Sequence, residues 1–298
     1  MHDISFSPVN CHLVTSFTGE QCQGNQHLVF VETTSISPQL YVCQTGCRDY
    51  YVDISLKLSP YIIVFLCLSE NKNDGKTRAG ARFFQNGREI LRCGSGSVAV
   101  AHTLFKIRAH NKPGDAFCSL VTPGGKVEIG CKNNEVFYLS PVLPLSTSYQ
   151  KRAWGNVINK PIKDVILVGS EKDYCILELY NRKAVKQCII NTQQLIRLSR
   201  RAVIVTALGE HWKHDYVMRY FTPQYGQYED KATGSANAML APYWQEKLAK
   251  TNVRSRQLSA AGGMLRIEQC GKRQRVFGKA GSQALPVNIK GIVDRIHE

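Results

Sequence analysis

Two short runs of small residues stand directly before stretches with the composition of apolar helices. The runs are CGSG at residues 93–96 and TGSA at residues 233–236. Glycine lets the backbone approach a ligand closely, and the first N–H groups of a helix have no partners inside the helix. Together with the helix dipole, these groups favour a small anion, to which the hydroxyls of Ser95 and Ser235 would add hydrogen bonds. The two runs therefore predict two carboxylate-binding helix starts.

The two runs belong to longer segments that repeat each other. The first segment has RFF at residues 82–84, then Glu89, then its run of small residues; the second has RYF at residues 219–221, then Glu229, then its run. The same order at nearly the same spacing indicates a tandem duplication of one α+β unit. One run alone is typical of an ordinary capped helix. The repetition favours two matched helix starts that face each other across a cleft and hold a carboxylate.

Residues 94–99, GSGSVA, also fit the G-x-G-x-x-A fingerprint of dinucleotide-binding turns. A dinucleotide site requires a parallel β-α-β unit, whereas a hairpin around Pro123-Gly124-Gly125 is predicted next. The second run also lacks the glycine spacing. We therefore expect no nucleotide cofactor.

Periodicity and turn residues predict the elements around the runs. We expect paired strands on both sides of Gly24-Asn25, and a hairpin at Asn86-Gly87. A helix should begin at Ser37-Pro38, because proline is favoured at the first helical position, and end near Gly46. Further expected elements are a short strand at residues 49–54, an apolar strand at 61–68, a helix at 97–109 and a helix or turn at 192–199.

Length and repetition indicate two domains of the α+β class. At 298 residues the chain exceeds one typical compact domain. The stretch at residues 141–149 is the predicted linker. We therefore expect an N-terminal domain at residues 1–145 and a C-terminal domain at residues 146–298, with the final strand or helix returning to the first domain as an open alternative.

The composition is that of a soluble globular protein, with 43% hydrophobic and 20% charged residues. The longest apolar run, residues 61–68, has the length of a strand rather than of a membrane span. The N-terminus lacks the basic start and continuous apolar stretch of a signal peptide. We therefore expect a cytoplasmic protein without a membrane partner.

The net charge of +15 and the eleven cysteines both raise the question of partners. Lys and Arg are spread along the chain and no nucleic-acid-binding module is recognisable, so a basic surface with an anion site is favoured over nucleic-acid binding. The cysteines form no CxxC pair, which argues against a zinc site. We interpret them as reduced thiols that are mostly buried, and we expect no bound metal.

The segment EDKATGSANAMLAPYW at residues 229–244 resembles the EDPATGSA signature of the phenazine-biosynthesis (PhzF-like) isomerase family. The resemblance implies a diaminopimelate-epimerase-like fold of two pseudo-symmetric domains, each a curved, mostly antiparallel sheet around a central helix. It also implies an isomerase, generally a homodimer, that moves a proton on a small carboxylic acid by general acid–base catalysis in the interdomain cleft and without a cofactor. Supporting matches along the chain are Phe17, Gly24-Asn25, Cys93-Gly94, Gly262-Gly263 and Gly278.

The working residues of this family are partly retained. Its acidic signature residue falls on Asp230 and its serine on Ser235, whereas the histidine that usually follows Cys-Gly is replaced by Ser95. Its essential glutamate falls on Asp49, which is shorter by one methylene. An alternative placement on the apolar strand near Ile62 leaves no carboxylate at this position.

The resemblance implies a division of labour among these residues. Asp49 would be the base or shuttle, and Asp230 a second acid or an orienting group. Because small misplacements slow catalysis strongly, the two departures leave open a non-catalytic family member that binds a small acid or a protein partner. The predicted substrate-binding residues are Gly94, Ser95, Gly234 and Ser235.

Cys93 has two interpretations. Racemase relatives use a thiol at both pseudo-symmetric positions, but the second position here is Thr233, so a symmetric two-thiol racemase is not expected. A helix start lowers the pKa of a thiol, which leaves Cys93 either a lone base or a structural thiol.

Overall fold

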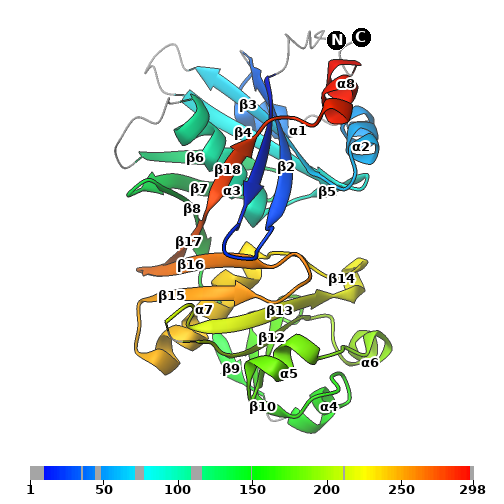
Figure 1. Cartoon of the computed structure of the whole chain (residues 1–298), viewed down its shortest axis with the longest axis vertical. Helices are drawn as coiled ribbons and strands as arrows, with labels where there is room; N and C mark the ends of the chain where they lie inside the picture. The colour runs from blue at the N-terminus through cyan, green and yellow to red at the C-terminus, as the bar shows by residue number, and fades with distance from the viewer. Residues whose placement is uncertain are drawn as a thin grey trace. The chain divides into compact units, whose positions relative to one another are not determined.

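The computed structural model describes residues 10–34, 36–43, 48–70, 77–108, 116–148, 150–210 and 212–295. The chain forms two compact units, whose elements are labelled in Figure 1. The first unit holds the described residues up to Ser16, Asn25–Tyr138 and those from Lys279 onward. The second unit holds Phe17–Gly24 and Leu139–Gly278. The end of the chain belongs to the first unit because its last strand pairs with the first strand of the chain.

The first unit contains a mixed sheet. Its strands are β1 (Asn10–Ser16), β2 (Asn25–Thr33), β3 (Ile62–Glu70), β4 (Thr77–Gln85), β5 (Arg88–Ile90), β6 (Ala116–Thr122), β7 (Gly125–Lys132), β8 (Glu135–Pro141) and β18 (Ala280–Gln283). β1 is antiparallel to β18 and β2, β2 is parallel to β3, and β3 is antiparallel to β4. β4 pairs with β5 antiparallel and with β6 parallel, and β6, β7 and β8 follow as antiparallel neighbours.

The second unit repeats this order. Its strands are β9 (Leu145–Thr147), β10 (Ile162–Val168), β11 (Tyr174–Leu179), β12 (Ala202–Leu208), β13 (Tyr216–Thr222), β14 (Gln227–Glu229), β15 (Asn252–Gln257), β16 (Gly263–Cys270) and β17 (Arg273–Gly278). β10 is antiparallel to β11, β11 is parallel to β12, and β12 is antiparallel to β13. β13 pairs with β14 antiparallel and with β15 parallel, and β15, β16 and β17 are antiparallel neighbours. The predicted duplication is confirmed.

The repeat extends to the register of the hairpins. Phe84 on β4 lies opposite Glu89 on β5, and Phe221 on β13 lies opposite Glu229 on β14. The two RFF/RYF segments and their glutamates therefore occupy equivalent places in the two units.

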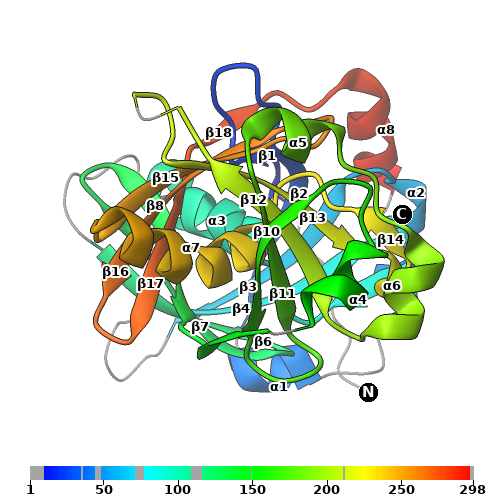
Figure 2. The ribbon, with the colours of Figure 1, turned by 90° about the horizontal axis from the view of Figure 1, so that it is seen from below.

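Each unit packs one buried helix against its sheet. The helices of the first unit are α1 (Pro38–Cys43), α2 (Arg48–Lys57), α3 (Gly94–His102), the π-helix at Thr103–Arg108 and α8 (Val287–Arg295). Those of the second unit are α4 (Lys151–Gly155), α5 (Arg182–Gln187), α6 (Thr192–Leu198), the 3₁₀ turn at Pro223–Tyr225 and α7 (Gly234–Leu248). α3 packs against β1, β2, β3 and β7, and α7 packs against β11, β15, β16 and β17 (Figure 2). Both helices begin at the glycine of a predicted run.

Two local predictions are corrected. Residues 49–54 form part of α2 rather than a strand, because Tyr51, Ile54 and Leu58 recur at helical spacing and are buried in one core. The helix predicted at residues 97–109 begins earlier, at Gly94. The predicted end of the first helix at Gly46 lies outside the described residues, as does Cys47.

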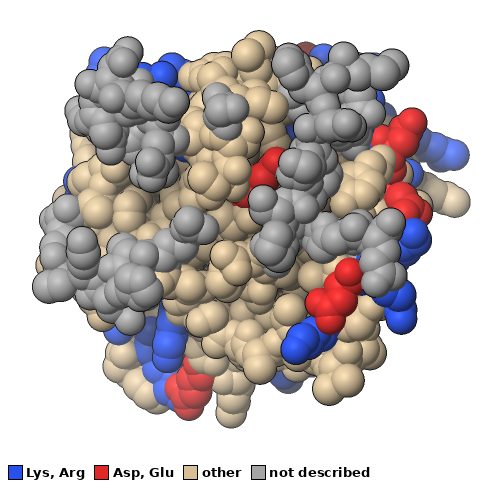
Figure 3. Space-filling view, turned by 90° about the horizontal axis from the view of Figure 1, so that it is seen from above, with Lys and Arg blue, Asp and Glu red and all other residues tan. Residues whose placement is uncertain are grey.

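None of the helices in the described ranges is long and apolar enough to cross a membrane. On the described part of the face in Figure 3, Lys and Arg are scattered among Asp and Glu rather than gathered in one patch.

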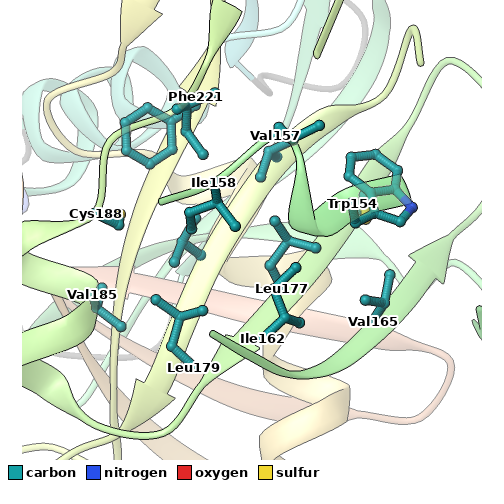
Figure 4. Packing of buried hydrophobic residues seen from close by; sticks show 14 of the residues in the cluster. Trp154, Val157, Ile158, Ile162, Val165, Leu177, Leu179, Val185, Cys188 and Phe221 are labelled. Carbon is teal, nitrogen blue, oxygen red and sulfur yellow. The ribbon is translucent and has the colours of Figure 1, made fainter. Parts of the chain in front are cut away.

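Each unit has its own apolar core. In the first unit the ring of Phe65 packs between those of Tyr51 and Phe30, with centroids 4.1 and 5.4 Å away. Ile289 and Val293 of α8 join this core. In the second unit, Trp154, Val157, Leu177 and Phe221 belong to the core drawn in Figure 4. Burial of each such apolar side chain contributes roughly 1.5–3 kcal/mol to folding stability. The cores therefore stabilise the sheets against which α3 and α7 pack.

Candidate active site at the two helix starts

Cys93 caps the first helix start with its own side chain. The Gly96 N–H donates to Cys93 Sγ at 3.3 Å, and the Ser97 N–H and hydroxyl both donate to the Cys93 carbonyl at 2.9 Å. These bonds satisfy amide groups that a helix leaves unpaired at its start. The thiol thus has a structural task in the resting protein.

The glycines of this run are required by packing. A Cβ on Gly94 would lie 2.7 Å from the Tyr138 hydroxyl, and one on Gly96 would lie 2.6 Å from the Phe83 ring. Side chains at these positions would displace the helix start from the sheet. Close approach of protein groups therefore accounts for both glycines.

His27 is a residue of this site that the sequence analysis missed. It lies on β2, is fully buried, and places Nε2 3.1 Å from Ser95 Oγ. Its Nδ1 lies 3.2 Å from the Val14 carbonyl oxygen. Burial lowers the pKa of His27 to about 4, against the opposing effect of the Val14 and Asn25 carbonyls. A histidine on the buried face of a strand beside Gly24-Asn25 is the sequence signal that could have pointed to it.

Asp230 stands at the second helix start. Its carboxylate accepts hydrogen bonds from the Thr233 hydroxyl and, at 2.8 Å, from the Lys231 N–H. Burial raises the pKa of Asp230, and the bonds from Thr233 and Lys231 oppose that rise. Asp230 and Thr233 stand at the two ends of the turn before α7, and the hydrogen bond between them holds their side chains together.

Gln257 fixes this turn and was also missed. The Thr233 N–H donates to Gln257 Oε1 at 2.8 Å, and Gln257 Nε2 donates to the Asp230 carbonyl at 2.7 Å. Gln257 is fully buried at the end of β15. No local pattern around residue 257 signals this role, because the contact joins segments far apart in sequence.

One tyrosine forms a hydrogen bond with Ser235, and a second tyrosine lies beside the first. Tyr174 forms a hydrogen bond with Ser235 that opposes the rise in the Tyr174 pKa caused by burial. The ring of Tyr220 lies 5.9 Å from that of Tyr174, between centroids, and burial raises the pKa of Tyr220 as well. Both phenols therefore stay protonated at neutral pH.

A buried ion pair supports the hairpin before each run. Arg82 Nε lies 2.7 Å from Glu89 Oε1, and Arg219 Nε lies 2.7 Å from Glu229 Oε1. The repeated Arg and Glu residues are thus partners in both units. They hold the strands that lead into the helix starts.

Asp49 lies on a different element of the first unit from Cys93 and Ser95. It is exposed in the first turn of α2, where an acidic side chain is favoured by the helix dipole. Within the described ranges, it forms no hydrogen bond or ion pair with the residues of either helix start. The alternative placement falls where β3 begins, and there Ile62 lies opposite His27 in the parallel ladder. Residues 58–68 contain no carboxylate.

The predicted residues thus form two local groups. In the first unit Cys93 and Ser95 lie together with His27, at 3.5 Å between Sγ and the Ser95 hydroxyl. In the second unit Asp230 lies with Thr233, and Ser235 lies with Tyr174. Gly94 and Gly234 are the first residues of α3 and α7.

Comparison with known proteins identifies relatives of the chain. A family model described as phenazine biosynthesis-like protein matches residues 63–291. An uncharacterized isomerase of Pseudomonas aeruginosa is 32% identical over 204 residues, covering 67% of this chain and 73% of the relative. An uncharacterized isomerase of Halalkalibacterium halodurans is 28% identical over 270 residues, covering 90% of this chain and 94% of the relative.

Solved structures show the same fold. A phenazine biosynthesis protein of the PhzF family from Enterococcus faecalis superposes with a TM-score of 0.74 at 22% identity, covering 93% of this chain and 97% of that one. A hydroxyproline epimerase from Agrobacterium vitis superposes with a TM-score of 0.51 at 12% identity, covering 95% of this chain and 92% of that one. The α+β fold is therefore of the diaminopimelate-epimerase-like type. Since the family model spans well over half of the residues, the chain belongs to the phenazine biosynthesis-like (PhzF-like) protein family.

Proposed function

We propose that this protein is an isomerase that moves a proton on a small carboxylic acid by general acid–base catalysis, without a cofactor. The observation that carries the proposal is Asp230, whose carboxyl group has a raised pKa beside the first turn of a buried helix. Related proteins named as isomerases in two bacteria support the same reaction class.

A carboxyl group with a raised pKa suits proton exchange near neutral pH. Its protonated and ionised forms are closer in free energy than those of an exposed aspartate, so it can give and take a proton within one catalytic cycle. Hydrogen bonds from Thr233 and Lys231 hold its carboxylate, and Gln257 holds its carbonyl. We therefore assign Asp230 the role of acid or orienting group.

The carboxylate of the substrate is proposed to bind at the helix starts. Gly234 and Ser235 offer backbone N–H groups and a hydroxyl at the first turn of α7. Gly94 and Ser95 occupy the corresponding place on α3, where their backbone N–H groups are the proposed donors. Because the two units repeat each other, we propose carboxylate binding at each helix start. The expected assembly is a homodimer.

The test is proton exchange in D₂O, followed by proton NMR, with a panel of small cyclic and amino-substituted carboxylic acids. We expect protein-dependent loss of a carbon-bound proton signal from at least one acid. Asp230→Asn should slow this loss at least about a hundredfold, since a positioned acid–base group contributes about 10²–10⁴ in rate. Asp53→Asn, on the exposed surface beside Lys57, is the matched control and should exchange at the wild-type rate.

A second candidate function is binding of a small acid without catalysis. It is favoured by the exposed position of Asp49 and by the absence of a carboxylate at residues 58–68. Asp49 remains the proposed base only if Asp49→Asn abolishes exchange. Line broadening of an acid in the panel, with no exchange by the wild-type protein, would support the binding function and overturn the isomerase.

A further inference from the structure

Three side chains of the first unit form a continuous row. Cys93 Sγ lies 3.5 Å from Ser95 Oγ, and Ser95 Oγ lies 3.1 Å from His27 Nε2. The row ends at the backbone, where His27 Nδ1 lies 3.2 Å from the Val14 carbonyl oxygen. His27 is fully buried and Ser95 is buried, whereas Cys93 is half-buried.

The contact of His27 with the Val14 carbonyl decides which atom donates in each hydrogen bond of the row. A carbonyl oxygen only accepts, so the contact with Val14 requires the proton of a neutral imidazole to be on Nδ1. Nε2 then carries a lone pair and accepts from the Ser95 hydroxyl. Because the Ser95 hydroxyl donates its proton to His27, its oxygen can only accept from Cys93. The Cys93 S–H is then the donor in that contact.

The imidazole stays neutral across the pH range in which such proteins work. Burial lowers the pKa of His27 to about 4, and the described groups that oppose this, the Val14 and Asn25 carbonyls, are neutral. The direction of the row is therefore the same at every pH above about 5.

The second unit places a different group at the equivalent position. His27 lies opposite Ile62, the first residue of β3, and Tyr174 lies opposite Ala202, the first residue of β12. Each side chain meets the serine of its own helix start. A phenol can donate or accept a hydrogen bond, whereas a neutral His27 with its proton on Nδ1 can only accept from Ser95.

We propose that His27 is a positioning residue of the first helix start, which takes the hydroxyl proton of Ser95 and makes Ser95 an acceptor toward Cys93. This inference rests on the proposed function, in which Ser95 belongs to the substrate-binding site and Cys93 is its neighbour. His27 also places an imidazole beside Ser95, the residue that stands where the family resemblance leads us to expect a histidine.

The consequence is a measurable pKa. While His27 holds the proton of Ser95, the serine cannot donate to a Cys93 thiolate. In His27→Leu the hydroxyl is free to turn toward Sγ and stabilise the thiolate, which should lower the pKa of Cys93 by about one unit. The same substitution in a Ser95→Ala background should leave the pKa of Cys93 nearly unchanged, because no hydroxyl remains to turn.

The experiment is alkylation of the full-length protein with iodoacetamide across a pH series, with the Cys93 peptide quantified by mass spectrometry. The four proteins are wild type, His27→Leu, Ser95→Ala and the double variant, each checked for cooperative thermal unfolding. A lowered pKa of Cys93 in His27→Leu that disappears in the double variant supports the proposal. Equal shifts in both backgrounds, or no shift in folded His27→Leu, would overturn it.

A second measurement uses only the wild-type protein and covers a variant that fails to fold. Nitrogen-15 NMR of the imidazole reports which ring nitrogen of His27 carries the proton. Protonated Nδ1 with unprotonated Nε2 is expected, and the opposite tautomer overturns the proposal. Neither measurement uses a substrate, so failure here is distinguishable from failure of deuterium exchange, which tests the isomerase itself.

Discussion

At the scale of single residues, the site is organised by buried polar groups whose partners come from distant strands. His27 and Gln257 are both fully buried; His27 bonds to the Ser95 hydroxyl, and Gln257 accepts from the Thr233 backbone N–H. Leaving such a group unpaired costs about 1–3 kcal/mol, so these contacts fix the Ser95 hydroxyl and the turn at Thr233. The chemistry proposed for Asp230 and Ser95 depends on that fixed geometry.

The burial of His27 predicts a specific acid sensitivity. Its pKa is about 4 in the folded protein and 6.5 when unperturbed, so the unfolded chain binds the extra proton first as the pH falls. Stability is therefore complete above about pH 6.5 and is lost progressively down to about pH 4, by about 3 kcal/mol in total. Urea unfolding of wild type and His27→Gln at several pH values checks this, since the glutamine variant lacks this component. Parallel pH dependence in both proteins would contradict it.

At the scale of elements, the signature residues outside the runs have packing roles within the second unit. A Cβ on Gly278 would lie 2.3 Å from the ring of Phe17, and one on Gly263 would lie 2.6 Å from the Cβ of Ala232. The Phe17 carbonyl accepts from the Met264 N–H at 3.0 Å, which ties this segment to β16. These contacts bring Phe17, Gly263 and Gly278, which are far apart in the sequence, into one packed region of the second unit.

The contact between Gly263 and Ala232 predicts that a substitution at Gly263, outside the site, displaces the turn that carries Asp230. Gly263→Ala should push the turn between Asp230 and Thr233 away from β16. Overpacking of this kind costs about 1–3 kcal/mol, and a displacement of about 1 Å costs about a hundredfold in rate. Thermal unfolding and deuterium exchange together measure both effects. Gly155→Ala, in the same unit and with no atom within 4 Å of an added Cβ, is the control for adding a methyl group without overpacking.

The two hairpin ion pairs offer a matched comparison across the repeat. The Arg82 and Glu89 side chains are 4% and 10% exposed, whereas those of Arg219 and Glu229 are 13% and 18% exposed. Glu89→Gln removes the negative charge from the more deeply buried of the two pairs and should cost about 3 kcal/mol or more, with a smaller loss for Glu229→Gln. Chemical denaturation of both variants tests the order. A larger loss in Glu229→Gln would contradict the burial argument.

At the scale of the whole molecule, the duplication was legible in the sequence because it repeats residue order. The RFF/RYF segments, their glutamates and the runs of small residues predicted two copies of one unit, and strand order and register confirm it. The helix at residues 48–57 was missed because its apolar residues, Tyr51 and Ile54, are also typical of a strand. Only their burial with Leu58 in one core shows the helical face.

The site was predictable only where its residues are neighbours in sequence. Cys93 with Ser95, and Asp230 with Thr233 and Ser235, follow from short motifs. His27 and Gln257 bond to runs that lie far from them in the sequence. Only His27, on a buried strand beside Gly24-Asn25, had a local signal, and Gln257 had none. Asp49 was placed by the family resemblance, and the structure shows it exposed in the first turn of α2.

The most direct test of the account is deuterium incorporation from D₂O into a small carboxylic acid, compared between wild type, Asp230→Asn and Asp53→Asn. The account predicts exchange at a carbon atom by wild type and Asp53→Asn, and a loss of at least about a hundredfold in Asp230→Asn. Exchange that continues undiminished in folded Asp230→Asn would contradict the assignment of Asp230 to proton transfer.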